Sequence, residues 1–230
     1  MANVPQHDLA QRMAELARSA ASPRSVQDVL AGVTAAAVEL LAGADTAGVL
    51  LVGKGGKFES LSGTSELIYR LDALQEKYGD GPCVDAALKE LVVRTDDFEH
   101  EQRWPEYSRV VCELGVRSGL SFKLYTGDRT AGALNVFSLK PHAFSPESEA
   151  IGSVLAAHAA AAILASREGE KLQSALISRD LIGQAKGIIM ERYGVDAVRA
   201  FEMLRKLSQE LNVRLTTIAQ RVVDTREDDT

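Results

Sequence analysis

The chain has 230 residues, a length that corresponds to one or two domains. Its hydrophobic fraction of 46% and charged fraction of 25% are those of an ordinary soluble protein, so they exclude disorder over most of the chain. Two cysteines, Cys83 and Cys112, supply neither a disulfide framework nor a structural zinc site. The apolar stretch Ile151–Ala165 is shorter than the roughly 20 residues that a membrane span requires, and the N-terminus lacks the pattern of a signal peptide. We therefore expect a reduced, cytoplasmic protein without a membrane segment.

Charge is distributed unevenly along the chain. The net charge of −6 divides into +4 over Lys171–Val223, with nine Lys and Arg against five Asp and Glu, and −10 over the remainder, with 17 against 27. This asymmetry predicts an acidic front module and a basic rear module. Lys and Arg bind polyanions by neutralising phosphates and releasing counterions, so a nucleic acid would contact the rear module. A charged, solvated surface is the alternative explanation.

The front module alternates predicted helices with short predicted strands. Two helices are expected first, over Asp8–Ala20 and from Ser22–Pro23 to about Leu41, because apolar residues recur at helical spacing and Ser-Pro is a favoured helix start. Strands are expected over Ala47–Val52, Phe58–Ser65, Leu91–Asp96, Leu120–Tyr125 and Ala131–Ser138, and further helices over Ile68–Lys77, Cys83–Glu90 and Trp104–Leu114. This order predicts an α+β fold in which helices flank one antiparallel sheet.

A long connector helix is predicted next. Ser145-Pro146-Glu147 combines a capping serine, a proline and an acid suited to a helix N-terminus, and no proline follows it. The segment to Tyr193 predicts one helix, or two that meet near Gly169. Positions 151, 155, 158, 162, 165, 169, 172, 176 and 179 alternate spacings of four and three, as in a coiled-coil seam. Their occupants are mixed, so dimerisation through the connector and packing of its first half on the sheet both stay open.

The rear module is predicted to contain three helices. The last turns of the connector carry an apolar stripe of Ile182, Ile189 and Tyr193. Gly194 is expected to end the connector, and Asp196 to cap a second helix that ends at Asn212. The apolar stripe of that second helix comprises Ala197, Ala200, Phe201, Leu204, Leu207 and Leu211. A third helix is expected over Leu215–Val223, followed by a frayed acidic tail from Arg226. A unit of roughly 55 residues is near the lower size limit for independent folding, so dimerisation would help to stabilise it.

The sequence shows no catalytic constellation. It has no HExxH, GxSxG or phosphate-loop motif, and its four histidines lack metal-ligand spacing. Cys83 follows Gly-Pro at a predicted helix start, where the helix dipole can lower the pKa of a thiol. A redox or nucleophilic role and a small structural residue are both open for Cys83. We predict no enzyme, no metal and no cofactor.

The rear module carries the most specific signature. The blocks QAKGIIM, AFEMLR and IAQRVV occur in order within Ser178–Val223, and this segment resembles an ANTAR domain. The resemblance implies the RNA-binding output module of bacterial transcription antitermination regulators. The front module resembles a GAF domain through its order of elements and the segment GDGPCVDAAL. The whole chain resembles the GAF-ANTAR regulators typical of actinobacteria, with a GAF-like sensor or dimerisation domain over residues 1–165 and an all-α, three-helix ANTAR domain over residues 166–230.

Two motifs of related proteins are absent from the sequence. The Asn-Lys-Phe-Asp-Glu motif of cyclic-nucleotide GAF domains does not occur, and no receiver domain is recognisable, so neither a cyclic nucleotide nor aspartate phosphorylation is implied. GAF-like folds usually place a ligand between the sheet and the segment that corresponds here to Ile68–Leu88. The resemblance therefore implies an unknown small ligand, apolar or mixed in character, in that space.

The charge pattern and the ANTAR resemblance together predict an RNA contact surface. The candidates are basic, polar or small residues outside the predicted apolar stripes: Gln184, Lys186, Gly187, Arg199, Arg205, Lys206, Arg214, Thr217, Gln220 and Arg221. Gly183 and Gly187 each cost a helix roughly 1 kcal/mol relative to alanine, so close approach of RNA or of another helix would account for them. Sequence-specific RNA recognition targets unstacked loops, so stem-loops are the expected ligand.

The leading hypothesis is a homodimeric antiterminator. It would hold stem-loops of a nascent transcript and so prevent a competing terminator hairpin. A DNA-binding regulator is the first alternative, because three helices also form helix-turn-helix units. A thiol enzyme is the second, because some GAF-fold proteins reduce free methionine sulfoxide through cysteines.

Overall fold

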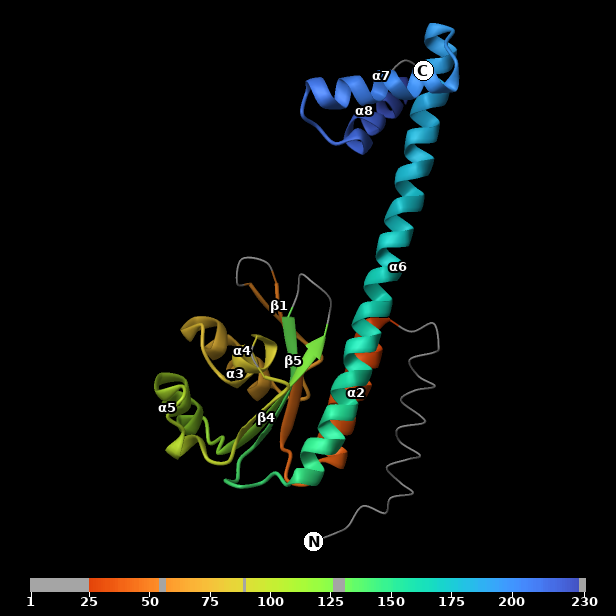
Figure 1. Cartoon of the computed structure of the whole chain (residues 1–230). Helices are drawn as coiled ribbons and strands as arrows, with labels where there is room; N and C mark the ends of the chain where they lie inside the picture. Colours follow the sequence, from red (N-terminus) through yellow and green to blue (C-terminus); the bar gives the residue numbers. More distant parts are fainter. Residues whose placement is uncertain (1–24, 54–56, 89, 126–130, 228–230) are drawn as a thin grey trace. The chain divides into compact units, whose positions relative to one another are not determined.

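The computed structural model describes residues 25–53, 57–88, 90–125 and 131–227 (Figure 1). The predicted helix Asp8–Ala20 and the predicted start at Ser22–Pro23 lie outside the described residues. The chain divides into two compact units, residues 1–166 and residues 167–230. Each unit is described by itself.

The first unit is built on one antiparallel sheet of five strands in the order β2-β1-β5-β4-β3. The strands are β1 (Thr46–Val52), β2 (Phe58–Leu61), β3 (Val92–Thr95), β4 (Ser118–Tyr125) and β5 (Ala131–Ser138). In β1, Val49 pairs with Leu61 of β2 on one side and with Leu134 of β5 on the other. The α+β fold predicted from the sequence is confirmed.

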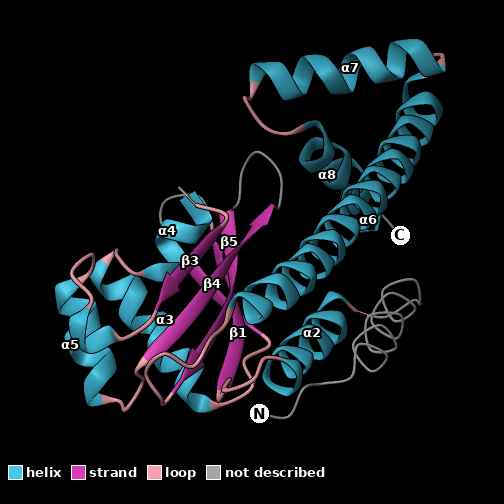
Figure 2. Cartoon of the chain, turned by 60° about the horizontal axis from the view of Figure 1, so that its bottom comes forward, coloured by secondary structure: helices cyan, strands magenta, loops and turns pink. Residues whose placement is uncertain are grey.

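Helices cover both faces of this sheet (Figure 2). The helices are α2 (Val26–Leu40), α3 (Glu66–Tyr78), α4 (Pro82–Leu88), η1 (Phe98–His100), α5 (Pro105–Glu113) and the first part of α6 (Pro146–Tyr193). Successive side chains of a strand point to opposite faces, so Val49 and Leu51 pack toward α2 and α6, whereas Leu50 packs toward α3, α4 and α5. The sheet therefore separates two hydrophobic cores.

The first part of α6 lies against the sheet of its own chain. Ile151 and Leu155, which belong to the predicted coiled-coil seam, are buried in the core shared with α2. The contact is close, because a Cβ atom at Gly152 would overlap the ring of Phe122. Packing on the sheet, one of the two arrangements left open by the sequence, therefore accounts for this part of the seam.

α6 is long and apolar enough to cross a membrane by length and composition, with a mean hydropathy of 1.5 over its most apolar window of 18 residues. Within the first unit, however, Leu155, Ala159 and Ile163 of this helix are almost fully buried. A core helix of a globular domain has the same composition as a span. Packing on the sheet thus explains these three residues, whereas Val154 and Leu164 of the same helix are exposed.

Most boundaries in the first unit differ from the prediction by one or two residues, as at α3 (Glu66–Tyr78) and β4 (Ser118–Tyr125), and those of α2, β2 and α4 have local causes or larger shifts. α2 begins at Val26 because Ser25 and Asp28 form a capping box, in which the Asp28 N–H donates to Ser25 Oγ at 3.2 Å and the Ser25 N–H donates to Asp28 Oδ2 at 3.3 Å. β2 ends at Leu61 rather than at Ser65 because Ser62 takes a left-handed conformation with φ of 51°. α4 spans Pro82–Leu88, whereas the prediction extended it to Glu90.

The second unit is a three-helix module formed by the last part of α6, α7 (Ala197–Glu210) and α8 (Leu215–Glu227). The six fully or nearly buried residues of its core are Ala185, Ile189, Ala200, Leu204, Ile218 and Ala219. Gly194 has φ of 64° and donates its N–H to the Met190 carbonyl at 3.0 Å, which confirms it as the C-cap. Asp196 Oδ1 accepts the N–H groups at 198 and 199 at 3.0 and 2.8 Å, which confirms it as the N-cap.

Two predictions for this module were wrong. α8 continues to Glu227, four residues past the predicted end at Val223, and Gln220 supports the extra turn by donating to Asp224 at 2.6 Å. On α7, three members of the predicted apolar stripe are exposed, namely Phe201, Leu207 and Leu211. The reason is that α6 and α8 cover only the middle of the stripe, over Ala200 and Leu204, and leave both edges in solvent.

Candidate nucleic-acid interface

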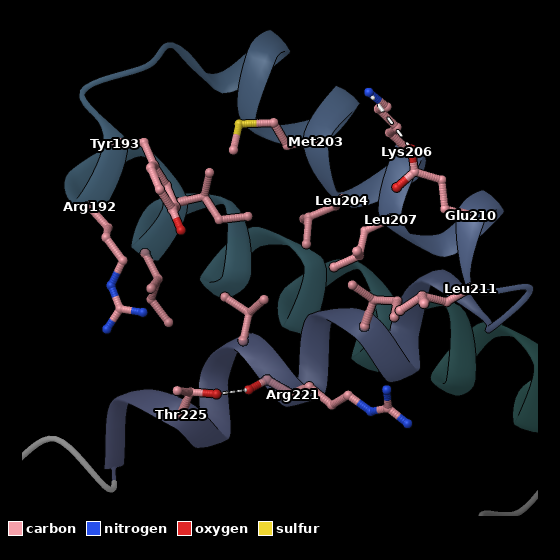
Figure 3. Close-up of a pocket in the computed structure, with 14 residues that line it drawn as sticks. Arg192, Tyr193, Met203, Leu204, Lys206, Leu207, Glu210, Leu211, Arg221 and Thr225 are labelled. Atoms are coloured by element: carbon pink, nitrogen blue, oxygen red, sulfur yellow. Dashed lines mark hydrogen bonds and ion pairs between the residues drawn. The ribbon is translucent and has the colours of Figure 1, made fainter.

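One uncovered edge of the α7 stripe forms the floor of an apolar groove between α6, α7 and α8 (Figure 3). The groove has a volume of about 420 Å³. Leu207 and Leu211 of α7 contribute its exposed apolar surface, together with Tyr193 on the last turn of α6. In Figure 3, Tyr193 lies at one end of the groove and Leu211 at the other.

Basic side chains surround this groove. Arg192 of α6, Lys206 of α7 and Arg221 of α8 line it, against a single acidic residue, Glu210. Glu210 Oε1 lies 3.7 Å from the Lys206 ammonium. The groove therefore combines an apolar floor with an excess of positive charge at its edges.

The opposite edge of the α7 stripe forms a second, smaller hollow. Lys186 of α6 meets Phe201 and Arg205 of α7 there, around a volume of about 370 Å³. Lys186 is half-buried, as expected for a lysine whose stem packs on apolar surface while its ammonium stays in water. Phe201, predicted to be a core residue, is 38% exposed in this hollow.

The structure thus sorts the predicted RNA-contacting residues into separate groups. Lys206 and Arg221 line the groove, and Thr217 lies one turn before Arg221 on α8, whereas Lys186 and Arg205 line the smaller hollow. They were predicted to form one surface, but the buried line of α7 runs between the two groups.

The remaining predicted residues lie elsewhere on the module. Gln184 and Gly187 are exposed on α6, on the side turned away from Ala185 and Ile189 and hence from the core of the module. Arg199 pairs with Glu202 at 3.1 Å on the outer side of α7. Arg214 precedes α8, where its carbonyl accepts N–H groups of the first turn, and Gln220 is engaged with Asp224. A partner that touched all ten residues would have to wrap around the module.

Two groove residues, Arg192 and Tyr193, were not among the predicted contacts. Sequence periodicity placed Tyr193 on the apolar stripe of α6, but it is 60% exposed. Its position directly before the C-cap Gly194 could have indicated this exposure. At the end of a helix, fewer neighbouring residues are available to cover a large ring.

The first unit contains a buried polar cluster between the sheet and the helices α3 and α4. Ser60 donates to Asp72 at 2.8 Å, Ser121 donates to Asn135 at 2.8 Å, and the Cys83 N–H donates to Gln75 Oε1 at 2.8 Å. Gln75 Nε2, Tyr107 Oη and Ser108 Oγ are buried without a hydrogen-bond partner among the described residues. This is the space in which the GAF resemblance places a ligand.

Apolar side chains are buried on the same face of the sheet. The core there includes Leu50, Ile68, Leu71, Cys83, Ala86, Trp104 and Tyr107. This side of the sheet therefore combines an apolar core with a buried polar cluster.

Burial controls the ionisation of the cluster. Desolvation raises the pKa of Asp72 to about 7, although hydrogen bonds from Ser60 and Asn135 act in the opposite direction. Burial, together with the nearby Asp72 carboxyl, raises the pKa of the Cys83 thiol well above its usual range. Burial thus opposes the activation of Cys83 by a helix N-terminus and favours the reading of Cys83 as a small structural residue.

Asp97, Glu99 and His100 form a group of potential metal ligands at η1. Arg117 already occupies this group, donating to both Asp97 oxygens at 3.1 Å and to Glu99. These hydrogen bonds lower the pKa of Asp97 to about 2. We interpret the group as an ion-pair cluster that joins η1 to the start of β4.

Comparison with known proteins agrees with this division into two modules. The family model of the GAF domain matches residues 23–164, and that of the ANTAR domain matches residues 170–223. A search of the curated proteins finds no match to the chain.

Solved structures share the fold of the first unit at low sequence identity. The GAF domain of a phosphoenolpyruvate-protein phosphotransferase from Coxiella burnetii aligns with a TM-score of 0.56 and 18% identity, over 73% of this chain and 99% of that one. A free methionine-R-sulfoxide reductase from Neisseria meningitidis aligns with a TM-score of 0.54 and 18% identity, over 74% and 96%. The phytochrome photosensory core module of Stigmatella aurantiaca reaches a TM-score of 0.61 at 12% identity, over 90% and 46%.

At these identities the solved structures establish the fold and not an activity. The GAF match covers more than half of the chain, and the ANTAR match follows it directly. The protein belongs to the GAF domain family and has the GAF-ANTAR architecture of a regulatory protein.

Proposed function

We propose that this protein is an RNA-binding transcription antitermination regulator. The observation that carries the proposal is the ANTAR domain at residues 170–223, which contains the segment Lys171–Val223 of charge +4 in a chain of net charge −6. Its cations flank the groove and the smaller hollow, both of which have apolar walls. This combination suits the phosphates and exposed bases of RNA loops. The protein would hold stem-loops of a nascent transcript in the cytoplasm and so prevent a terminator from forming.

The proposal is tested by comparing nucleic acids on the full chain. RNA with paired hairpins, duplex RNA of the stem sequence alone, and duplex DNA of the same sequence are titrated in gel-shift assays. We expect the hairpin RNA to bind most tightly. Equal or tighter binding of duplex DNA would support the DNA-binding alternative, which no feature of the described residues favours.

We further propose that the protein acts as a homodimer through α6. In the second unit, Leu172 and Leu176 are about three-fifths exposed, and Gly183 and Gly187 continue the same side of the helix at spacings of seven and four. A Cβ atom at either glycine would meet nothing within 4 Å in this chain. A second α6 packed on this side would bury the leucines and account for the glycines.

Sedimentation at micromolar concentration tests the dimer. The parent is expected to sediment as a dimer, and the double variant Leu172→Glu, Leu176→Glu as a monomer, because like charges would face each other across the seam. A variant with the same change in charge on the opposite side of the helix, Ser174→Glu with Ser178→Glu, serves as the control. A monomeric parent would contradict the proposal.

A further inference from the structure

The groove between α6, α7 and α8 has the size and lining of a small-molecule site rather than of plain surface. Its volume of about 420 Å³ falls in the range of ligand pockets. Met203, Leu207 and Val222 line it with apolar groups, and Leu207 remains 41% exposed. The surface is thus apolar and uncovered in the chain as it stands.

Tyr193 gives the groove a flat aromatic wall. Tyr193 is 60% exposed, and its side chain lies at one end of the groove (Figure 3). The Gly194 C-cap fixes the last turn of α6 and therefore the position of this ring. Exposed aromatic rings of this kind are the surfaces on which unstacked bases lie in single-stranded nucleic acid complexes.

The charges select an anionic occupant. Arg192 and Arg221 lie toward opposite ends of the groove in Figure 3, and Lys206 adds a third cation above it. Glu210 is the single acid in the lining, and it is already close to Lys206. An occupant with a flat apolar body and phosphates on both sides satisfies this arrangement, whereas an apolar protein helix would bring no negative charge to it.

We infer that this groove holds one unstacked nucleobase of an RNA loop, stacked on Tyr193, while Arg192 and Arg221 contact the phosphates on either side of it. The inference rests on the proposed RNA-binding function and adds the position at which a loop is read. It also separates the groove from the hollow at Lys186, which lies across the buried line of α7.

The test uses a stem-loop RNA selected on the full chain from a library with a randomised loop. Each loop position is replaced in turn by an abasic nucleotide, and binding is measured for the parent and for Tyr193→Ala. For the parent, one loop position is expected to lose about 5- to 150-fold in affinity, the range for loss of one base–aromatic stack. In Tyr193→Ala, removing the base at that position should cost nothing further.

Controls keep the outcomes distinct. Tyr193→Phe retains the flat ring and should behave as the parent, and Phe201→Ala, in the other hollow, should leave the abasic profile unchanged. Leu207→Ser provides a second groove variant that does not alter the tyrosine. In addition, 2-aminopurine at the sensitive position should be quenched by the parent and not by Tyr193→Ala.

Three results would overturn the inference. An abasic penalty that is equal in the parent and in Tyr193→Ala, with hairpin binding intact, would refute the groove and leave the RNA-binding function standing. If the parent selects no stem-loop, the proposed function and the inference both fail. If Tyr193→Ala loses dimerisation but not RNA affinity, the groove is an interface between copies of the chain.

Discussion

Asp72 illustrates how burial outweighs hydrogen bonding at a single residue. Its carboxyl is 2% exposed and has two hydrogen-bonding partners, Ser60 and Asn135, yet its pKa rises from 3.8 to about 7. Desolvation of a charge in the core costs more than those two bonds return. The first unit therefore carries a proton on Asp72 in the acidic range.

Replacing Asp72 with Asn should flatten the pH dependence of stability in the first unit. Below pH 4, Asp72 is protonated in both the folded and the unfolded chain. Between pH 4 and 7 only the unfolded chain loses the proton, so the free energy of unfolding falls, by up to about 4 kcal/mol. Asp72→Asn removes that fall. Urea titrations at several pH values, followed by the fluorescence of the buried Trp104, measure it.

The exposed carboxyl variant Glu59→Gln is the control, and it should keep the parent's slope. An Asp72→Asn protein whose stability still declines across pH 4–7 as steeply as the parent's would show that Asp72 is not the group responsible.

Cys83 should be inert toward alkylation in the folded protein. Its side chain is fully buried and its thiol pKa is raised, while Cys112 is only partly buried. Because the thiolate is the reactive form, iodoacetamide at pH 8 should modify Cys83 only after denaturation, as read by peptide mass spectrometry. In Cys112→Ser the native protein should take up no label. Rapid native labelling of Cys83 would reopen the question of a thiol reaction.

At the scale of elements, local signals predicted the ends of helices better than the surfaces that helices bury. Gly194 and Asp196 could be assigned from the sequence because a cap depends on two or three adjacent residues. α2 begins at Val26, where Ser25 and Asp28 form a capping box, and this pair of residues was not used as a signal in predicting the helix start.

The candidate site was predicted in composition but not in arrangement. Periodicity identifies an apolar stripe, yet it does not say how much of that stripe the neighbouring helices cover. Leu207, Leu211 and Tyr193 are therefore exposed where burial was expected. Whether Lys186 and Arg221 share a surface likewise depends on the crossing of α6, α7 and α8, which no local pattern contains.

The glycine pair on α6 provides a test at this scale. Both positions have room for a methyl group in the isolated chain, so Gly183→Ala with Gly187→Ala should stabilise the helix by roughly 1 kcal/mol per site. The same methyl groups would hold a second α6 away from the seam. We therefore expect a higher thermal midpoint by circular dichroism together with a weaker dimer by sedimentation.

Ser174→Ala, on another side of the same helix, should leave the dimer unchanged. A glycine-to-alanine double variant that dimerises as tightly as the parent would show that the glycines serve no close approach between copies.

At the scale of the whole molecule, the chain joins an acidic α+β module to a helical module in which the segment Lys171–Val223 has a charge of +4. The first unit has a hydrophobic core on each face of its sheet, whereas the second exposes apolar side chains among its cations. This contrast is expected for a regulatory protein in which the first module is a scaffold and the second module binds nucleic acid. The central claim is therefore that the positive surfaces of the ANTAR module bind RNA.

The most direct test is a salt titration of hairpin-RNA binding by the full chain, for the parent and for Lys186→Ala with Arg221→Ala. This variant removes one cation from the groove and one from the smaller hollow. Arg109→Ala with Lys140→Ala, at two exposed residues of the first unit, is the control that removes the same amount of positive charge. We predict weaker binding at every salt concentration and a logarithmic salt slope that falls by about one unit, or somewhat less, for each phosphate that the variant no longer neutralises. A folded, dimeric double variant that keeps the parent's affinity and slope would contradict the account.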